Sequence, residues 1–124
     1  IEKNVFIGFI MWWDFKGFQY LDHFAVTKSL RNLGYGAKIL EDFIKGNSNP
    51  TLLEVELPNS SFNERRIKFY ERLGIKLNLH EYNVPSSIDD RKIDLLVMTY
   101  PTLISIETLQ EFVCNHHPII FKSF

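Results

Sequence analysis

Residues 21–37 read LDHFAVTKSLRNLGYGA and join an apolar run, a basic turn with two glycines and the beginning of a helical pattern. The run Gln19–Val26 predicts a strand, and apolar residues recur at helical spacing after Gly36. Gly34 and Gly36 lack a Cβ atom, so the backbone here can take a positive φ and approach an anion closely. A helix N-terminus also offers unpaired amides and a favourable dipole. Residues 31–36 are therefore expected to form either a pyrophosphate-binding cradle or a tight strand-to-helix turn.

Hydrophobic periodicity on either side of this turn predicts a mixed α/β fold in a single domain over residues 1–124. Strands are expected at 5–13, 19–26, 51–57, 75–82, 93–100 and 119–121, and helices from 36 to a stop at Gly46, from 61 to 73 and from 105 to 115. The first strand is apolar throughout and is expected to be buried on both faces. Ser61 and Glu64 are expected to form a capping box for the second helix, with Gly74 as its left-handed terminator. A loop is expected over 84–92.

Composition and charge narrow the classes of protein to which this chain can belong. Its 14 basic and 15 acidic residues give a formal net charge of −1, which argues against a nucleic-acid-binding protein. No apolar run approaches the roughly 20 residues of a membrane span, and no signal peptide is visible, so a cytoplasmic location without membrane contact is expected. The single cysteine, Cys114, fits a reducing compartment and is expected to be buried. Because the chain opens with Ile1 rather than Met, we expect the natural protein to extend upstream.

Two motifs, in this order along the chain, resemble those of the GNAT acyltransferase superfamily. The run LDHFAVT at 21–27, followed by RNLGYGA at 31–37, is similar to the family's acyl-CoA-binding motif, Q/R-x-x-G-x-G/A after a strand. The run NERRIKFYERLGI at 63–75 is similar to the family's N-x-x-A-x-x-F-Y-x-x-L-G-F helix, although Arg66 replaces a small residue and Ile75 replaces phenylalanine. The resemblance implies a GNAT-like mixed central sheet flanked by helices. It also implies that the family's N-terminal strand and two helices would precede this chain.

The resemblance further implies that an acyl-CoA, in the first instance acetyl-CoA, is the acyl-donor substrate, and that no metal is needed. Residues implied to contact the coenzyme are Phe24, Ala25, Val26, Arg31, Asn32, Leu33, Gly34, Tyr35, Gly36, Ala37, Asn63, Phe69 and Tyr70. The strand residues among them would pair with the pantetheine amides as an added strand does. A backbone N–H near Val26 would donate to the oxyanion of the tetrahedral intermediate. Asn63 would hydrogen-bond the pantetheine arm or its neighbourhood.

Acyl transfer from a thioester to an amine also needs a base for the ammonium and a proton donor for the leaving thiolate. The resemblance implies that Tyr70 protonates the thiolate; the alternative is a core aromatic packed beside Phe69. The candidate bases are Glu54 first and Asp22 second, and each could instead be a solvated or salt-bridged strand residue. Strand alternation predicts that Asp22 and His23 point to opposite faces.

Three functions are compatible with these patterns. The leading hypothesis is an N-acyltransferase that transfers acetyl from acetyl-CoA to an amine of an unidentified acceptor. The alternatives are a catalytically inactive GNAT-like domain that binds CoA, and an α/β interaction module whose glycine turn binds nothing. The strand at 5–13 is expected to bury against upstream elements or against a second copy, which would make a homodimer. His80, His116 and His117 lack zinc-site spacing, and the two before Pro118 are expected at a solvated helix end.

Overall fold

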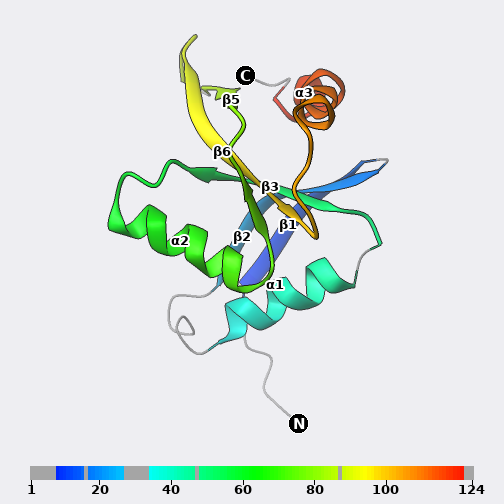
Figure 1. The fold of residues 1–124 in the computed structure, drawn as a ribbon, viewed down its shortest axis with the longest axis vertical. Helices are drawn as coiled ribbons and strands as arrows, with labels where there is room; N and C mark the ends of the chain where they lie inside the picture. The colour runs from blue at the N-terminus through cyan, green and yellow to red at the C-terminus, as the bar shows by residue number, and fades with distance from the viewer. Residues whose placement is uncertain (1–7, 16, 27–33, 47, 87, 122–124) are drawn as a thin grey trace. The chain divides into compact units, whose positions relative to one another are not determined.

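The computed structural model describes five stretches of the chain, residues 8–15, 17–26, 34–46, 48–86 and 88–121 (Figure 1). The chain divides into two compact units, residues 1–51 and 52–124. Both units contain strands and helices, which confirms the mixed α/β class predicted from the sequence. None of the helices in the described stretches is long and apolar enough to cross a membrane.

The first unit is built on an antiparallel hairpin of β1 (Gly8–Phe15) and β2 (Phe18–Val26), as predicted. Gly17 forms its turn with a φ of 88°, a conformation that strongly favours glycine. The register shifts between Met11 and Trp12, so that Asp22 is the extra residue of a β-bulge in β2.

The prediction that the first strand is buried on both faces is wrong for its described residues. Met11 is 52% exposed and Trp12 is 49% exposed. Trp12 packs edge-on against Phe43 with ring centroids 5.0 Å apart, so one part of the indole is covered while the rest faces outward. A strand paired through one edge, with a helix over one face, buries only part of its apolar side chains.

The helix of the first unit, α1 (Tyr35–Lys45), follows the predicted apolar spacing and buries Leu40 and Ile44. It ends where the amide of Gly46 bonds to the carbonyl of Asp42 at 3.0 Å. A Cβ atom at Gly46 would lie 2.9 Å from that same oxygen, so glycine is required by close approach rather than by a positive φ.

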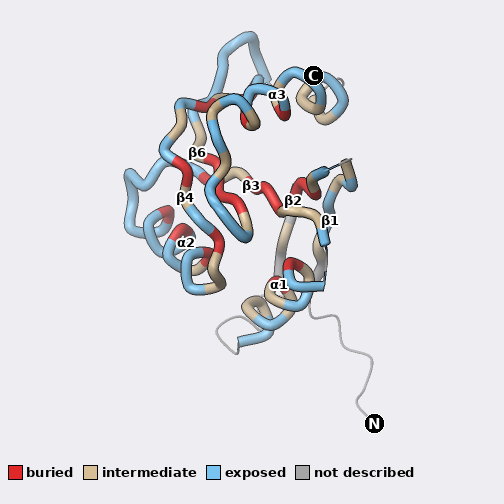
Figure 2. Tube along the Cα trace, turned by 45° about the vertical axis from the view of Figure 1, so that its right-hand side comes forward, coloured by how far each residue is buried: buried red, intermediate tan, exposed pale blue. Residues whose placement is uncertain are grey.

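The second unit contains four strands and two helices: β3 (Thr51–Glu56, beginning at the last residue of the first unit), α2 (Ser61–Arg72), β4 (Lys76–Asn78), β5 (Asn83–Pro85), β6 (Lys92–Tyr100) and α3 (Ile106–Ile120). In its sheet β6 lies between β3 and β4, and β5 forms a second antiparallel pair with the beginning of β6. Buried residues concentrate on β3, β6 and one side of each helix (Figure 2). The side chains at the centre of this core are Leu52, Ile75, Val97, Met98, Leu109 and Phe112.

The strand predicted at 75–82 is interrupted, because Asn78 bonds to a loop instead of continuing the ladder. Its Nδ2 donates to Oγ1 of Thr99 at 2.9 Å, and its Oδ1 accepts from the amide of Ile104 at 3.0 Å. His80 Nε2 lies 2.8 Å from the carbonyl of Ile104. The chain resumes as β5, so the predicted loop at 84–92 was too long at its start.

The ends of α2 and α3 also differ from prediction. Ser60, not Ser61, caps α2 and accepts from the amide of Asn63 at 3.1 Å, so the predicted capping box with Glu64 is wrong. The strand predicted at 119–121 is wrong as well, because α3 continues through Pro118 to Ile120. Proline lacks its own N–H but the next turn still closes, with the amide of Phe121 donating to the carbonyl of His117 at 2.9 Å.

Two further predictions concern Gly74, after α2, and Cys114, on α3. Gly74 follows α2 with a φ of 87°, as predicted for a left-handed terminator. Cys114 is exposed on α3, so the prediction that it is buried is wrong.

Candidate functional site

In the first unit, the described part of the predicted cradle is Gly34, Tyr35 and Gly36, where α1 begins. Gly34 is the N-cap residue with a φ of 84°, and a Cβ atom placed on it would meet no atom within 4 Å among the described residues. No side chain of the described residues caps this helix, and its first turn carries no acidic residue. The amides of Tyr35, Gly36 and Ala37 therefore belong to a helix N-terminus that suits an anion. The other cradle residues, at 31–33, lie outside the described residues.

The strand that precedes the cradle holds the candidate Asp22 at its bulge. Trp13 Nε1 donates to Oδ2 of Asp22 at 3.1 Å, and the carboxylate is half-buried. The prediction that Asp22 and His23 alternate assumed a regular strand, and the bulge removes that basis. The last residues of β2, Phe24 to Val26, pair with the first described residues of β1, from Ile10 back to Gly8.

In the second unit, the candidate base Glu54 is one end of a hydrogen-bonded chain of three side chains. Leu52, Glu54 and Glu56 share a face of β3 and run from buried through half-buried to exposed. The Tyr82 hydroxyl donates a hydrogen bond to Oε2 of Glu54. The same hydroxyl lies 2.7 Å from Nε2 of His117 on α3.

His117 is held among aromatic rings. Its ring centroid lies 5.5 Å from that of Tyr82, 5.6 Å from Phe112 and 5.0 Å from Phe121. Burial among these rings lowers the pKa of His117 from 6.5 to about 4, because desolvation disfavours the imidazolium. His117 is therefore neutral at physiological pH, and the prediction of a solvated histidine is wrong for it.

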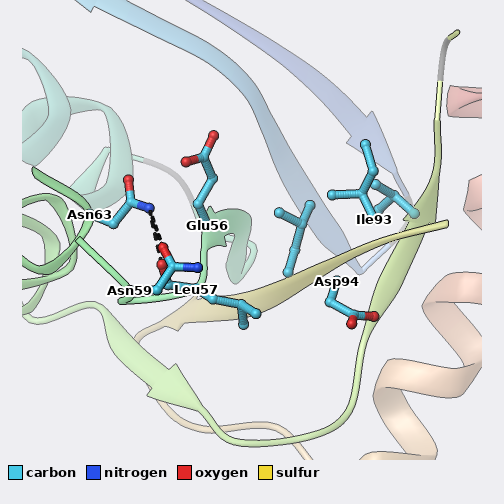
Figure 3. A pocket seen from close by; sticks show the side chains of 8 residues that line it. Glu56, Leu57, Asn59, Asn63, Ile93 and Asp94 are labelled. Atoms are coloured by element: carbon cyan, nitrogen blue, oxygen red, sulfur yellow. Dashed lines mark hydrogen bonds between the residues drawn. The ribbon is translucent and has the colours of Figure 1, made fainter.

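A pocket with a volume of about 360 Å³ opens at the end of β3 (Figure 3). Its lining residues are Glu56, Leu57, Asn59, Asn63, Val84, Ile93, Asp94 and Leu95. Two of these described residues are carboxylates and none is basic. Figure 3 shows the facing amides of Asn59 and Asn63 on one side of this pocket.

Asn63 is fixed by the backbone that leads into α2. Its Nδ2 donates to the carbonyl of Leu57 at 3.0 Å and to Oδ1 of Asn59 at 3.3 Å. The side chain is 8% exposed and reaches the pocket from the first turn of the helix. Asn63 occupies the third helical position after the cap Ser60, and its backbone amide donates the capping bond to Oγ of Ser60.

Tyr70 lies two turns further along the same helix. Its ring is buried and packs edge-on against Phe69 with centroids 5.5 Å apart. Tyr70 and Glu54 do not line the pocket that contains Asn63. The second unit therefore holds four predicted residues, Glu54 on β3 and Asn63, Phe69 and Tyr70 on α2, and only Asn63 lines the pocket.

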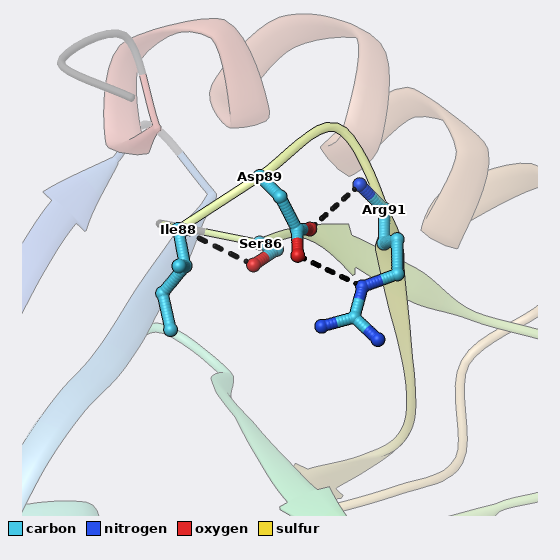
Figure 4. Close-up of polar contacts among 4 residues, drawn as sticks. All are labelled: Ser86, Ile88, Asp89 and Arg91. Carbon is cyan, nitrogen blue, oxygen red and sulfur yellow. Dashed lines mark hydrogen bonds and ion pairs between the residues drawn. The ribbon is translucent and has the colours of Figure 1, made fainter.

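The hairpin of β5 and β6 closes with a polar turn (Figure 4). The amide of Arg91 donates to Oδ1 of Asp89 and its Nε donates to Oδ2, both at 2.9 Å. The amide of Ile88 donates to Oγ of Ser86 at 3.1 Å. This turn presents Ile88 to solvent with 89% exposure.

Sequence reasoning missed Tyr82 and His117, because their partners are distant in sequence. Tyr82 is 28 positions from Glu54 and 35 positions from His117. No local spacing signals such a chain. The one available hint was that His117 directly precedes the apolar run Pro118 to Phe121.

Comparison with known proteins agrees with this architecture. A family model described as an acetyltransferase (GNAT) domain matches residues 1–75. This chain belongs to the GNAT acetyltransferase family. No curated protein matches the sequence.

Solved structures support the same fold. A putative acetyltransferase of the GNAT family from Bacteroides thetaiotaomicron is 35% identical, with a TM-score of 0.84 over 93% of this chain and 66% of its own. The ribosomal-protein-S18-alanine N-acetyltransferase from Escherichia coli is 25% identical, with a TM-score of 0.57 over 82% of this chain and 64% of its own. NAA60 from Arabidopsis thaliana in complex with acetyl-CoA is 17% identical, with a TM-score of 0.52 over 67% of this chain and 47% of its own. This chain thus spans less than two thirds of the length of each of these relatives.

Proposed function

We propose that this chain carries donor-binding and catalytic residues of a single-domain N-acyltransferase that transfers acetyl from acetyl-CoA to an amine. The observation that carries the proposal is Gly34, whose left-handed backbone opens α1 without a capping side chain from the described residues. A related fold was solved with acetyl-CoA, and another relative is named as an N-acetyltransferase that acts on an alanine of a ribosomal protein.

Donor-binding roles are proposed for residues of each unit. The amides that follow Gly34 face the pyrophosphate, and Arg31 adds a cation. The backbone of Phe24 to Val26 pairs with the pantetheine arm, and the N–H near Val26 donates to the developing oxyanion. Asn63 is pre-oriented by its bonds to Leu57 and Asn59, so its side-chain oxygen can accept a bond from the arm.

Acetyl-CoA supplies an activated acyl carbon with a thiolate leaving group. An acceptor of the lysine type has a pKa near 10.4 and must lose a proton before its nitrogen can attack. Glu54 accepts that proton, directly or through water, and the nitrogen lone pair forms the C–N bond of a tetrahedral oxyanion. The C–S bond breaks as this oxyanion collapses, and Tyr70 donates its hydroxyl proton to the leaving sulfur. The second proton, which the nitrogen loses as the amide forms, restores the Tyr70 hydroxyl. Asp22 is the alternative base, already engaged by Trp13.

The acceptor is expected to be cationic where it meets the second unit. Glu56 and Asp94 place negative charge on the pocket, and none of its described lining residues offsets that charge. Such a surface attracts an ammonium and repels an anionic acceptor.

The test is an assay of the full-length protein with acetyl-CoA and a panel of amines, in which the release of free thiol is measured. Thiol release is expected to require an amine and to fall roughly 10²–10⁴-fold in Glu54→Gln, because a general base contributes about that much. Glu71→Gln, on an exposed position of α2, is the matched control and should match the wild type. Acetyl-CoA binding without transfer to any amine would contradict the enzyme and favour the inactive CoA-binding alternative.

A further inference from the structure

We propose that Tyr82 and His117 are positioning residues that aim the Glu54 carboxylate and keep it ionised for its role as base. The inference rests on the proposed function and adds two residues that lie outside both GNAT motifs of the sequence. It starts from the hydrogen-bonded chain that links β3, the connection between β4 and β5, and α3.

The direction of this chain follows from counting protons. The Tyr82 hydroxyl has one proton, which it donates to Oε2 of Glu54. Its oxygen can then only accept, so Nε2 of His117 must carry a proton and donate across the 2.7 Å contact. A neutral His117 with its proton on Nε2 satisfies both bonds at once.

The chain matters for Glu54 because its surroundings would otherwise disfavour a charge. Glu54 is half-buried and Tyr82 is 4% exposed, and desolvation favours the neutral form of a carboxyl group. A hydrogen bond donated to the charged form has the opposite effect. His117 strengthens that bond by preventing the hydroxyl from turning away, since a rotated hydroxyl would meet the Nε2 proton.

Titratable groups beside the hydrogen-bonded chain come from β3, β6 and α3. On β6, Asp94 precedes Leu95, whose amide donates to the carbonyl of Tyr82 at 3.1 Å. On β3 the neighbouring carboxylate on the same face is Glu56, which is exposed. On α3, Phe112 and Phe121 cover the His117 ring, and the ring of His116 packs on Phe112 at 5.4 Å. Among the described residues whose contacts are given, Tyr82 is therefore the donor that sets the state of Glu54.

The first test is the pH profile of kcat/KM for acetyl transfer. Tyr82→Phe keeps the ring but removes the hydroxyl that stabilises the charged Glu54 carboxylate. The acidic limb of the variant's kcat/KM profile should therefore lie about one pH unit higher than that of the wild type. His117→Leu should move the limb in the same direction, whereas His117→Gln, which keeps an N–H donor, should stay close to the wild type. The KM for acetyl-CoA should not change.

His80→Leu is the matched control for the loss of a histidine bond. His80 holds the carbonyl of Ile104 and lies outside the chain to Glu54, so this variant can lose stability without moving the limb. A limb shift of equal size in His80→Leu would contradict the positioning role.

A readout that needs no activity separates this inference from the proposed function. The 13C chemical shift of the Glu54 carboxyl, followed against pH in the full chain, should titrate at a higher pH in Tyr82→Phe than in the wild type. If the wild type shows no acetyl transfer but the titration midpoint is higher in Tyr82→Phe, the enzyme assignment fails while the positioning role of Tyr82 is supported. If the midpoint is the same in both proteins, the inference is overturned even when transfer is observed.

Discussion

The hydroxyl of Tyr82 lies 2.7 Å from Nε2 of His117, which ties the connection between β4 and β5 to the last turns of α3. The bond joins residues 35 positions apart and continues to Glu54 on β3. A half-buried histidine in this position is neutral because burial lowers its pKa to about 4. Three segments of the second unit therefore meet at one polar contact.

The first prediction concerns stability against pH. The pKa of His117 is about 4 in the folded protein and 6.5 as its ordinary value, so the unfolded chain binds more protons between these limits. The contribution of neutral His117 is present above pH 6.5 and is lost as the pH falls towards 4. Between pH values of about 7 and 5 we expect a loss on the order of 1 kcal/mol, after discounting for the partly exposed ring.

Urea unfolding of the wild type and of His117→Gln at both pH values measures this effect. The variant cannot titrate at this position, so its free energy of unfolding should fall less on acidification. Equal losses in the two proteins would show that His117 does not titrate below its ordinary range.

The second prediction concerns the cap of α2. Ser60→Ala removes the oxygen that accepts from the amide of Asn63 and should cost about 1 kcal/mol of unfolding free energy. Ser61→Ala, one position later and exposed inside the first turn, should be neutral or slightly stabilising because alanine favours helix. Chemical denaturation of the two variants decides between the adjacent serines, and a larger loss in Ser61→Ala would reverse the assignment.

The third prediction concerns Tyr70. Tyr70→Phe retains the buried ring and its edge-on contact with Phe69 but lacks the proton for the leaving sulfur. We expect kcat to fall by roughly 10²-fold or more, with the affinity for acetyl-CoA unchanged in calorimetry. Tyr100→Phe, a half-buried tyrosine at the end of β6, serves as the control. An unchanged turnover number in Tyr70→Phe would remove Tyr70 from the mechanism.

Features fixed by neighbouring residues could be predicted from the sequence. The hairpin turn, the helix after Gly34 and the terminator Gly74 depend on backbone conformations that favour glycine, and the pattern of apolar residues marks the elements between them. The predicted cap of α2, Ser61, is one residue away from the observed cap, Ser60. The two adjacent serines are chemically equivalent, and only the backbone conformation distinguishes them. The GNAT resemblance likewise depends on two short motifs, each within a single stretch of chain.

Features that depend on distant contacts could not be predicted in this way. Asn78 interrupts a strand only because Thr99 and Ile104, which are 21 and 26 positions away, offer it partners. The long helix α3 overrides the usual effect of Pro118 as a stop, and the bulge at Asp22 exists only in the pairing of β1 with β2. The chain from Glu54 to His117 is of the same kind.

The acyl-CoA site is tested most directly by calorimetric titration of acetyl-CoA into the full-length protein, Gly34→Ala and Gly17→Ala. The two glycines have nearly equal positive φ values, 84° and 88°, and an added Cβ would meet no described atom within 4 Å at either one, so alanine strains both backbones alike. We predict saturable binding by the wild type and Gly17→Ala. Binding should be weaker by roughly tenfold or more in Gly34→Ala, because the first amides of α1 no longer point at the pyrophosphate. Absence of binding by the wild type, or equal affinity in all three proteins, would contradict the assignment of an acyl-CoA site.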